Sequence, residues 1–474
     1  HLLRRNPDLL DWGTEPIGTS VTDGNGDGEF TDTFATEDAK FYRAGYELPA
    51  PNIVVIFTDD QTFGAIGYDN PAIRTPNLDA LAARGLVFER AYAASPICVA
   101  SRASLMTGQF PQQNGVYALN SAAFAPYLTG GAKAGLTLPS QMKARGYHTV
   151  AYGESHLGAF TGYGFAQGQE TPQHDDVVAF AEVATFLASD QAKRQPFFLW
   201  VAPRRPHVPL LPAQQWLDLY DGVDLPLPAN FRTSPLPLSI NNQGTPAQDF
   251  YRDSTYTDTW MNLPAGPPRD QTVIKNFTRA YYAVLSHLDS QVGAMVQQLK
   301  NKGLWDNTIV FFLSDNGYHL GSHGLGNKIT MHEESVRVPM FAVGGGVAAG
   351  ARSPALVSTL DLYPTVVDLA GAGSTPGHAA GRSLRPILRN PTAAIRDSVF
   401  SECVGVGGVA GQGHRMARTT THKYVLTDTN EEYLFDLRTD PVVFLWILPL
   451  RSDGQEEPSW TLGRTFPYDR HNYQ

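Results

Sequence analysis

The part of the sequence most informative about the fold is Asn52-Ile-Val-Val-Ile-Phe-Thr-Asp-Asp60. Its apolar residues follow one another without the alternation of a strand that has one face in water, so the pattern predicts a strand buried on both faces. A second stretch, Thr308-Ile-Val-Phe-Phe-Leu-Ser-Asp-Asn316, has the same form. Strands of this kind belong to parallel sheets that are covered by helices on both sides.

Patterns around these two strands continue an alternation of strands and helices. The clearest helix runs from about residue 277 to 300, where apolar residues recur every three or four positions. The sequence therefore predicts an α/β fold, with a large and mostly parallel sheet sandwiched by helices. Further strands are expected at 147–152, 197–201 and 338–343, and further helices at 75–85, 138–144 and 361–370.

The chain divides into three predicted parts, at residues 1–50, 51–371 and 372–474. The first is an extension that contains Asp23-Gly-Asn-Gly-Asp-Gly-Glu-Phe-Thr-Asp32, which is similar to the start of an EF-hand calcium loop. Its twelfth position is Phe34, which cannot close the loop as a bidentate ligand, so a solvated acidic linker is the favoured interpretation. The second part is the large α/β domain, and short strand-like pieces at 422–426 and 432–435 predict an antiparallel sheet in a smaller C-terminal α+β subdomain.

The net charge and the length of the apolar runs argue against two classes of function. The net charge of −10 across 474 residues argues against a nucleic-acid partner, which needs clustered Lys and Arg. No apolar run approaches the roughly 20 residues that span a bilayer. The chain begins at His1 without Met, which is expected of a mature or trimmed form, and a secreted or periplasmic protein would fit.

Polar pairs follow both decisive strands. Asp59 and Asp60 come directly after the first, and Asp315 and Asn316 after the second. The carboxyl ends of parallel strands meet at one edge of a sheet, where ligands usually bind. Three carboxylates and a carboxamide suit calcium or magnesium rather than zinc. An aspartate at a strand end also caps turns, so each pair alone would not require a metal.

The chain has two cysteines, Cys98 and Cys403. A disulfide between them or a buried structural thiol are the ordinary interpretations. Cys98, however, opens the string Cys-Val-Ala-Ser-Arg-Ala-Ser-Leu-Met-Thr-Gly108. At the start of a short helix it would face unpaired N–H groups, which favour anions. Arg102, one turn later, could fix a carboxylate or a modified nucleophile.

This string resembles the signature of the type I sulfatases of the alkaline-phosphatase-like superfamily, and the resemblance extends from Pro51 to about Pro441. In that family the cysteine is converted to formylglycine by a maturation enzyme, and the hydrated aldehyde is the nucleophile. The usual motif has proline two residues after the cysteine, where this chain has Ala100.

Other motifs occur in the same order as in that family. Pro206-His207-x-Pro209 resembles a segment whose histidine contacts the sulfate ester, and Lys328 resembles the sulfate-binding lysine. Outside this context Lys328 would be a surface lysine, and His156 and His207 ordinary histidines. The resemblance implies these catalytic residues: Cys98, Arg102, His156, His207 and Lys328. It implies a calcium site, with magnesium as the alternative, formed by Asp59, Asp60, Asp315, Asn316 and Cys98.

The chain departs from the family at two further places. Gly153-Glu-Ser-His-Leu-Gly158 matches a segment in which the family has lysine where Glu154 stands here. Three outcomes are open: Glu154 points away, another cation such as Arg204 or Lys133 substitutes, or turnover is impaired. The second departure is the apolar stretch 442–450 and the tail to residue 474, which match no family pattern.

The resemblance implies hydrolysis of a sulfate ester, with motifs closest to carbohydrate sulfatases such as N-acetylglucosamine-6-sulfatase. The expected partner is therefore a small-molecule or oligosaccharide sulfate ester. A phosphodiester or phosphonate monoester hydrolase on the same fold is the alternative enzyme. A catalytically weak sulfoglycan-binding protein is the alternative from another class.

Overall fold

The computed structural model describes residues 50–171, 176–236, 238–241, 271–371, 376–404 and 413–439. It also describes the backbone of four short strands, β1 (Leu2–Asn6), β2 (Gly18–Thr19), β3 (Phe41–Gly45) and β17 (Leu448–Pro449). The calcium-loop-like segment 23–34 lies outside the described residues, as does the tail apart from β17. The predictions for both segments therefore stay predictions.

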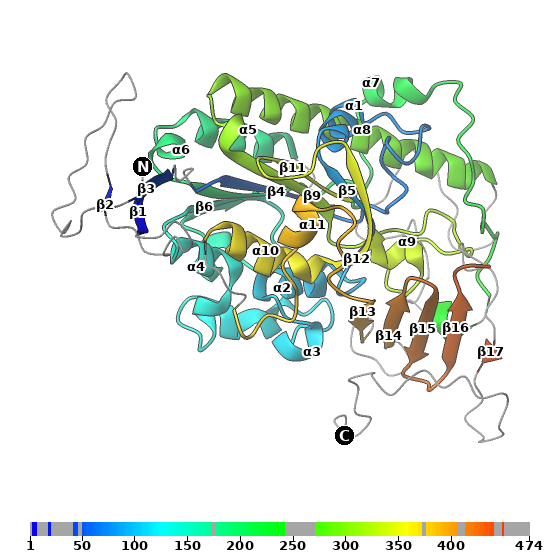
Figure 1. The fold of residues 1–474 in the computed structure, drawn as a ribbon. Helices are drawn as coiled ribbons and strands as arrows, with labels where there is room; N and C mark the ends of the chain where they lie inside the picture. Colours follow the sequence, from blue (N-terminus) through cyan, green and yellow to red (C-terminus); the bar gives the residue numbers. More distant parts are fainter. Residues whose placement is uncertain are drawn as a thin grey trace.

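A nine-stranded sheet forms the centre of the molecule (Figure 1). Its two middle strands are β4 (Asn52–Thr58) and β9 (Thr308–Ser314), which pair in parallel along their whole length, from Asn52 beside Thr308 to Thr58 beside Ser314. The register brings the carboxyl ends of both strands to the same point. On the far side of β4 the parallel sheet continues through β8 (Phe197–Ala202), β6 (His148–Gly153) and β7 (Gln167–Glu170).

The other half of the sheet is mixed. Strand β11 (Met340–Gly344) runs antiparallel to both β9 and β5 (Leu86–Tyr92). The edge is completed by β10 (Arg337–Val338), antiparallel to β5, and β12 (Ala351–Ser358), parallel to it. The predicted α/β fold is confirmed, and the predicted strand 338–343 is the place where the parallel order ends.

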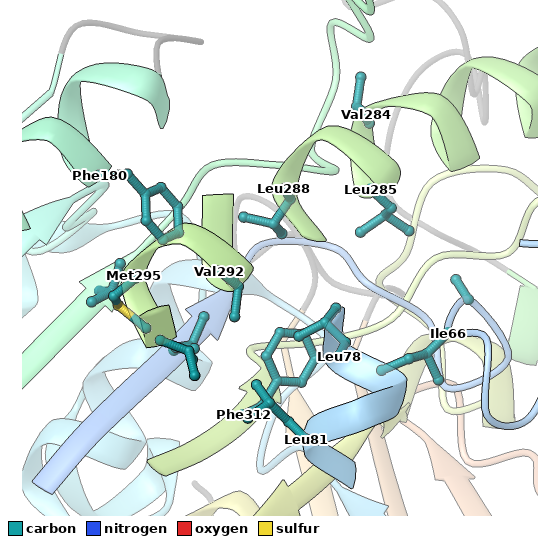
Figure 2. Packing of buried hydrophobic residues seen from close by; sticks show 14 of the residues in the cluster. Ile66, Leu78, Leu81, Phe180, Val284, Leu285, Leu288, Val292, Met295 and Phe312 are labelled. Atoms are coloured by element: carbon teal, nitrogen blue, oxygen red, sulfur yellow. The ribbon is translucent and has the colours of Figure 1, made fainter. Parts of the chain in front are cut away.

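Helices cover both faces of the sheet, and β4 shows why. Val54 and Ile56 point into one apolar cluster, whereas Ile53, Val55 and Phe57 point into the other. The first cluster is covered by α8 (Gln271–Asn301), α1 (Pro76–Ala83) and α5 (Asp176–Ala188), and Figure 2 shows the apolar face of α8 above the sheet. The second is covered by α2 (Cys98–Thr107), α4 (Leu138–Lys143) and α10 (Leu362–Leu369). Within the described part of the chain, no helix combines the length and the apolarity that crossing a bilayer requires.

A separate antiparallel sheet lies beside the β12 edge of the main sheet (Figure 1). It consists, in order, of β13 (Ser398–Cys403), β14 (His414–Thr419), β15 (His422–Thr427), β16 (Glu432–Asp436) and β17. The predicted antiparallel C-terminal sheet is thus confirmed, while the predicted domain boundaries at residues 50 and 371 remain predictions.

A buried ion cluster joins this second sheet to the main body. Glu333 begins the short helix α9 (Glu333–Val336), and its carboxylate lies 3.3 Å from Lys423 Nζ of β15 and 3.6 Å from Arg418 Nε of β14. The hydroxyl of Tyr92 donates a hydrogen bond to Glu333, at 2.8 Å. Burial opposes ionisation of Glu333, but Lys423 and Arg418 outweigh it and hold its pKa below the ordinary value.

Replacing Glu333 with Gln is expected to lower the free energy of unfolding by about 3 kcal/mol, because Lys423 is fully buried and would lose its counter-charge. Urea denaturation measures the loss. The double variant Glu333→Gln with Lys423→Met should recover part of it, and Glu432→Gln, on the neighbouring strand, should change stability by less than about 0.5 kcal/mol. Equal stability of Glu333→Gln and the unchanged protein would contradict this account.

Candidate active site

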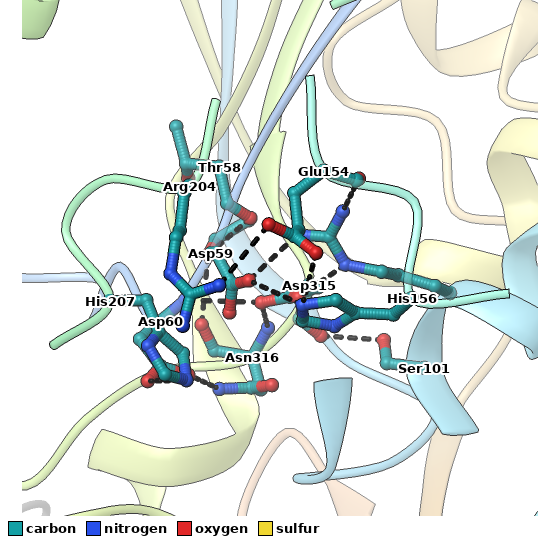
Figure 3. Close-up of polar contacts among 12 residues, drawn as sticks. Thr58, Asp59, Asp60, Ser101, Glu154, His156, Arg204, His207, Asp315 and Asn316 are labelled. Atoms are coloured by element: carbon teal, nitrogen blue, oxygen red, sulfur yellow. Dashed lines mark hydrogen bonds and ion pairs between the residues drawn. The ribbon is translucent and has the colours of Figure 1, made fainter. Parts of the chain in front are cut away.

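The two polar pairs meet at the carboxyl ends of β4 and β9, as the sequence predicts (Figure 3). The amide of Asp60 donates a hydrogen bond to Asp315 Oδ1, at 3.1 Å, and the carboxamide of Asn316 donates to Asp60 Oδ1, at 2.7 Å. Asp59, Asp60, Asp315 and Asn316 are all at most 1% exposed. Three buried carboxylates in such close contact require compensating positive charge.

Asp60 has a left-handed backbone, with φ of 68°, which costs a non-glycine residue about 1–2 kcal/mol. Tyr281 of α8 holds this conformation, because its hydroxyl donates to the carbonyl of Asp60 and accepts from the amide of Thr62. The sequence analysis missed Tyr281, since an aromatic residue within an amphipathic helix has the appearance of a core residue.

Arg102 supplies part of the positive charge. It is 2% exposed and lies one turn after the start of α2. Its Nε donates to Asp315 Oδ2 at 2.9 Å, and its Nη2 lies 3.2 Å from Asp59 Oδ2. Burial opposes ionisation of Asp59, but Arg102 and the other basic groups outweigh it and keep its pKa well below the ordinary range. Burial, followed by the repulsion of Asp59, raises the pKa of Asp315.

Cys98 is the first residue of α2, as predicted, and is 4% exposed. It is not joined to Cys403 by a disulfide. Burial is the main cause that raises the pKa of its thiol, to about 12, and the nearby carboxylates of Asp59 and Asp315 add to it. An unmodified thiol in these surroundings is therefore protonated at neutral pH and is a poor nucleophile.

Lys328 and the two predicted histidines face the same carboxylates. Lys328 Nζ donates to Asp60 Oδ1 and lies 3.8 Å from Asp59 Oδ1. His207 Nε2 is 3.7 Å from Asp60 Oδ2, and His156 Nε2 is 3.5 Å from Asp59 Oδ2. Burial lowers the pKa of His156 well below its ordinary value, so its imidazole is neutral at pH 7. The structure thus brings every predicted site residue to one place.

Glu154 also lies at this site, next to His156. It follows Gly153, whose φ of 118° and close approach to the carbonyl of Ala202 leave no room for a Cβ. Its carboxylate lies 3.4 Å from His156 Nε2 and 3.2 Å from Arg204 Nη1 (Figure 3). Of the three outcomes considered, that in which Glu154 points away is therefore wrong. Arg204 is the cation beside it, whereas Lys133 contacts the ring and hydroxyl of Tyr127.

The loop that carries Arg204 and His207 is held by Asp176, the first residue of α5. This carboxylate is 1% exposed and accepts hydrogen bonds from the amides of Arg204 and Arg205, at 2.7 and 3.1 Å. The loop borders a small hollow lined by Arg204, Arg205, His207, Pro209 and Leu211. The sequence analysis missed Asp176, because an acidic residue in the first turn of a helix usually serves the helix alone.

The residues fit a hard metal ion. The ligand atoms of Asp59, Asp60 and His207 lie within 4.8 Å of one another. Both carboxylate oxygens of Asp59 and Oδ1 of Asn316 are buried and accept no hydrogen bond from the described residues. Arg102 and Lys328 lie beside the Asp59 oxygens without hydrogen-bonding to them, so these oxygens keep lone pairs with which they could bind a metal ion. An oxygen-rich set suits calcium or magnesium.

Comparisons with known proteins find sulfatases. The sulfatase family model matches residues 51–372, and the model of the N-sulphoglucosamine sulphohydrolase C-terminal region matches residues 321–448. A choline-sulfatase from Rhizobium meliloti is 29% identical over 83% of this chain and 81% of its own length. An N-acetylglucosamine-6-O-sulfatase from Bacteroides thetaiotaomicron is 26% identical, over 83% of this chain and 82% of its own.

Among solved structures, a protein in complex with its substrate D-glucosamine-2-N,6-O-disulfate superposes with a TM-score of 0.71. The match covers 83% of this chain and 92% of that one, at 24% identity, and shows that the fold is shared. The matched family model spans more than half of the chain and includes every residue of the site described above. The chain therefore belongs to the sulfatase family of sulfuric-ester hydrolases.

Proposed function

We propose that this enzyme hydrolyses sulfate esters of a carbohydrate, using formylglycine formed from Cys98 together with a calcium ion. The observation that carries the proposal is the buried Asp59 carboxylate, which accepts no hydrogen bond from the described residues and lies among Arg102, Lys328 and Cys98. A sugar substrate is supported by the N-acetylglucosamine-6-O-sulfatase relative, whereas the choline-sulfatase relative shows that the same scaffold also serves another sulfate ester.

Asp59, Asp60, Asp315 and Asn316 would hold the ion, together with the residue derived from Cys98. When present, calcium would polarise the sulfate oxygens and formylglycine would provide the nucleophile. Magnesium is the alternative ion. His207 is close enough to Asp60 to be a further ligand, so its contact with the metal and its contact with the ester are alternatives within the proposal.

The chain's own residues then have separate tasks. Lys328 brings a positive charge to the position where the sulfate group would bind. Lys328 is buried, and its attraction to the sulfate group would be stronger there than in water. His156 is neutral and buried, so its imidazole has an unprotonated nitrogen that would serve as the proton acceptor, while burial opposes the charge that results. Arg102 contacts two carboxylates and the carbonyl of Glu154, and so keeps the site assembled.

Mass spectrometry of the peptide that contains residue 98 tests the nucleophile. Protein produced in its native host, or together with a formylglycine-generating enzyme, is expected to carry formylglycine at position 98 despite Ala100. An unmodified thiol in protein from the native host would contradict the proposal, and would favour a sulfoglycan-binding protein with little turnover. The peptide that contains Cys403 is the internal control, because it should keep its thiol.

Sulfate release tests the reaction. Glucosamine 6-sulfate, N-acetylglucosamine 6-sulfate, choline sulfate and 4-nitrocatechol sulfate should be compared under the same conditions, and the sugars are expected to give the highest kcat/KM. A higher value for choline sulfate would contradict the sugar preference but not the sulfatase chemistry. The proposal includes a secreted or periplasmic location, which cell fractionation of the native host checks.

A further inference from the structure

Glu154 introduces a negative charge into the site described above. Its side chain is 19% exposed, and one carboxylate oxygen lies 3.4 Å from the same His156 nitrogen that faces Asp59. The other oxygen lies 3.2 Å from Arg204 Nη1. Figure 3 shows the Glu154 carboxylate in contact with Arg204 and His156, beside Asp59 and Asp315.

The balance of charge at this site has a consequence for the substrate. Three cationic side chains face four carboxylates: Arg102, Arg204 and Lys328 against Asp59, Asp60, Asp315 and Glu154. The proposed divalent metal would leave one net positive charge. A sulfate monoester carries one negative charge, which matches that balance. A phosphate monoester carries close to two at neutral pH, because its second pKa is about 6.

We propose that Glu154 is a specificity-determining residue that makes this site favour singly charged sulfate esters over doubly charged phosphate monoesters. This inference rests on the proposed function, because it assumes that the ester binds beside Asp59 and Lys328. Coulomb energy is proportional to the product of the two charges. The Glu154 carboxylate therefore repels a dianion about twice as strongly as a monoanion in the same position.

Arg204 acts in the opposite direction. Its side chain is 11% exposed, and its Nε is buried with no hydrogen-bond partner among the described residues. Its positive charge attracts a dianion more than a monoanion, and the contact with Glu154 offsets most of that preference. The two residues form one ion pair. Neutralising Glu154 should therefore favour the dianion, and neutralising Arg204 should favour the monoanion.

The test compares kcat/KM for 4-nitrophenyl phosphate and 4-nitrophenyl sulfate in the formylglycine-containing enzyme with excess calcium. In Glu154→Gln, the ratio of phosphate to sulfate turnover is expected to rise at least tenfold, ~1.4 kcal/mol. In Arg204→Met, the same ratio is expected to fall. The phosphonate monoester 4-nitrophenyl phenylphosphonate carries one charge, so its ratio to the sulfate should stay within about threefold in both variants.

Glu182→Gln, at a half-buried position of α5, is the matched control for loss of a carboxylate and should leave both ratios unchanged. A phosphate-to-sulfate ratio that stays within threefold in Glu154→Gln, in an enzyme that still releases sulfate, would overturn the inference and leave the proposed function intact. A parallel rise for the phosphonate would also overturn it, because charge would then not be the cause. Absence of sulfate release from the unchanged enzyme would instead contradict the proposed function.

Discussion

Cys98→Ala is expected to reduce the rate of sulfate release by at least about a thousandfold, because the variant has no side chain from which formylglycine can form. The neighbouring groups cannot replace it. Lys328 forms an ion pair with Asp60, and the imidazole Nε2 of His156 faces the carboxylate of Asp59. Neither side chain offers a hydroxyl or thiol that could attack the ester. The rate should be measured on the best sugar sulfate, with calcium present.

The fold should survive this change. Cys98 is a small buried residue at the first position of α2, where alanine is well tolerated, and its neighbour Ser101 keeps its 2.6 Å hydrogen bond to the carbonyl of Asp315. Far-ultraviolet circular dichroism and the melting temperature should be close to those of the unchanged protein. Cys403→Ala, the matched control on β13, should keep its turnover. Turnover near that of the unchanged enzyme in Cys98→Ala would remove this residue from the mechanism.

Much of the site could be predicted because it depends on strand ends. Two apolar runs, each followed by a polar pair, were sufficient to place Asp59 and Asp315 together, and the parallel register of β4 and β9 confirms it. A helix start at Cys98 also placed Arg102 one turn into the site. These are short-range patterns, in which side-chain direction follows from the period of the element.

The remaining features depend on tertiary contacts that leave no local pattern. The direction of the Glu154 side chain depends on Gly153 and on the loop that carries Arg204. Asp176, more than twenty residues after Glu154 in the chain, holds that loop. Tyr281 of α8 contacts Asp60, although the two residues are 221 positions apart in the sequence. The antiparallel course of β11 was likewise hidden, because a strand buried on both faces has the same composition in either direction.

Removal of the metal is expected to have the second large effect. Incubation with a chelator should lower sulfate release at least about a hundredfold, since the developing charge on the sulfate group would lose its main electrostatic partner. Calcium should restore the rate, and the comparison with magnesium identifies the preferred ion. Binding should also be visible without any substrate, because calcium at about 100 times its Kd stabilises the folded state by about 2.7 kcal/mol and so raises the melting temperature.

Asp59→Asn separates the metal from the rest of the site. Both Asp59 oxygens are buried and accept no hydrogen bond from the described residues, so this carboxylate should contribute strongly to the affinity for the metal ion. The variant should lose the calcium-dependent rise in melting temperature. Without calcium it should be less stable than the unchanged protein, because the Asp59 carboxylate, whose pKa is held well below its ordinary range, no longer pairs with the buried Arg102. Asp368→Asn, whose carboxylate contacts Ser383 and Arg385 outside the site, should keep the full calcium effect. A calcium effect that persists in Asp59→Asn would place the ion elsewhere, and Arg102 and Lys328 alone would then balance the charge of Asp59.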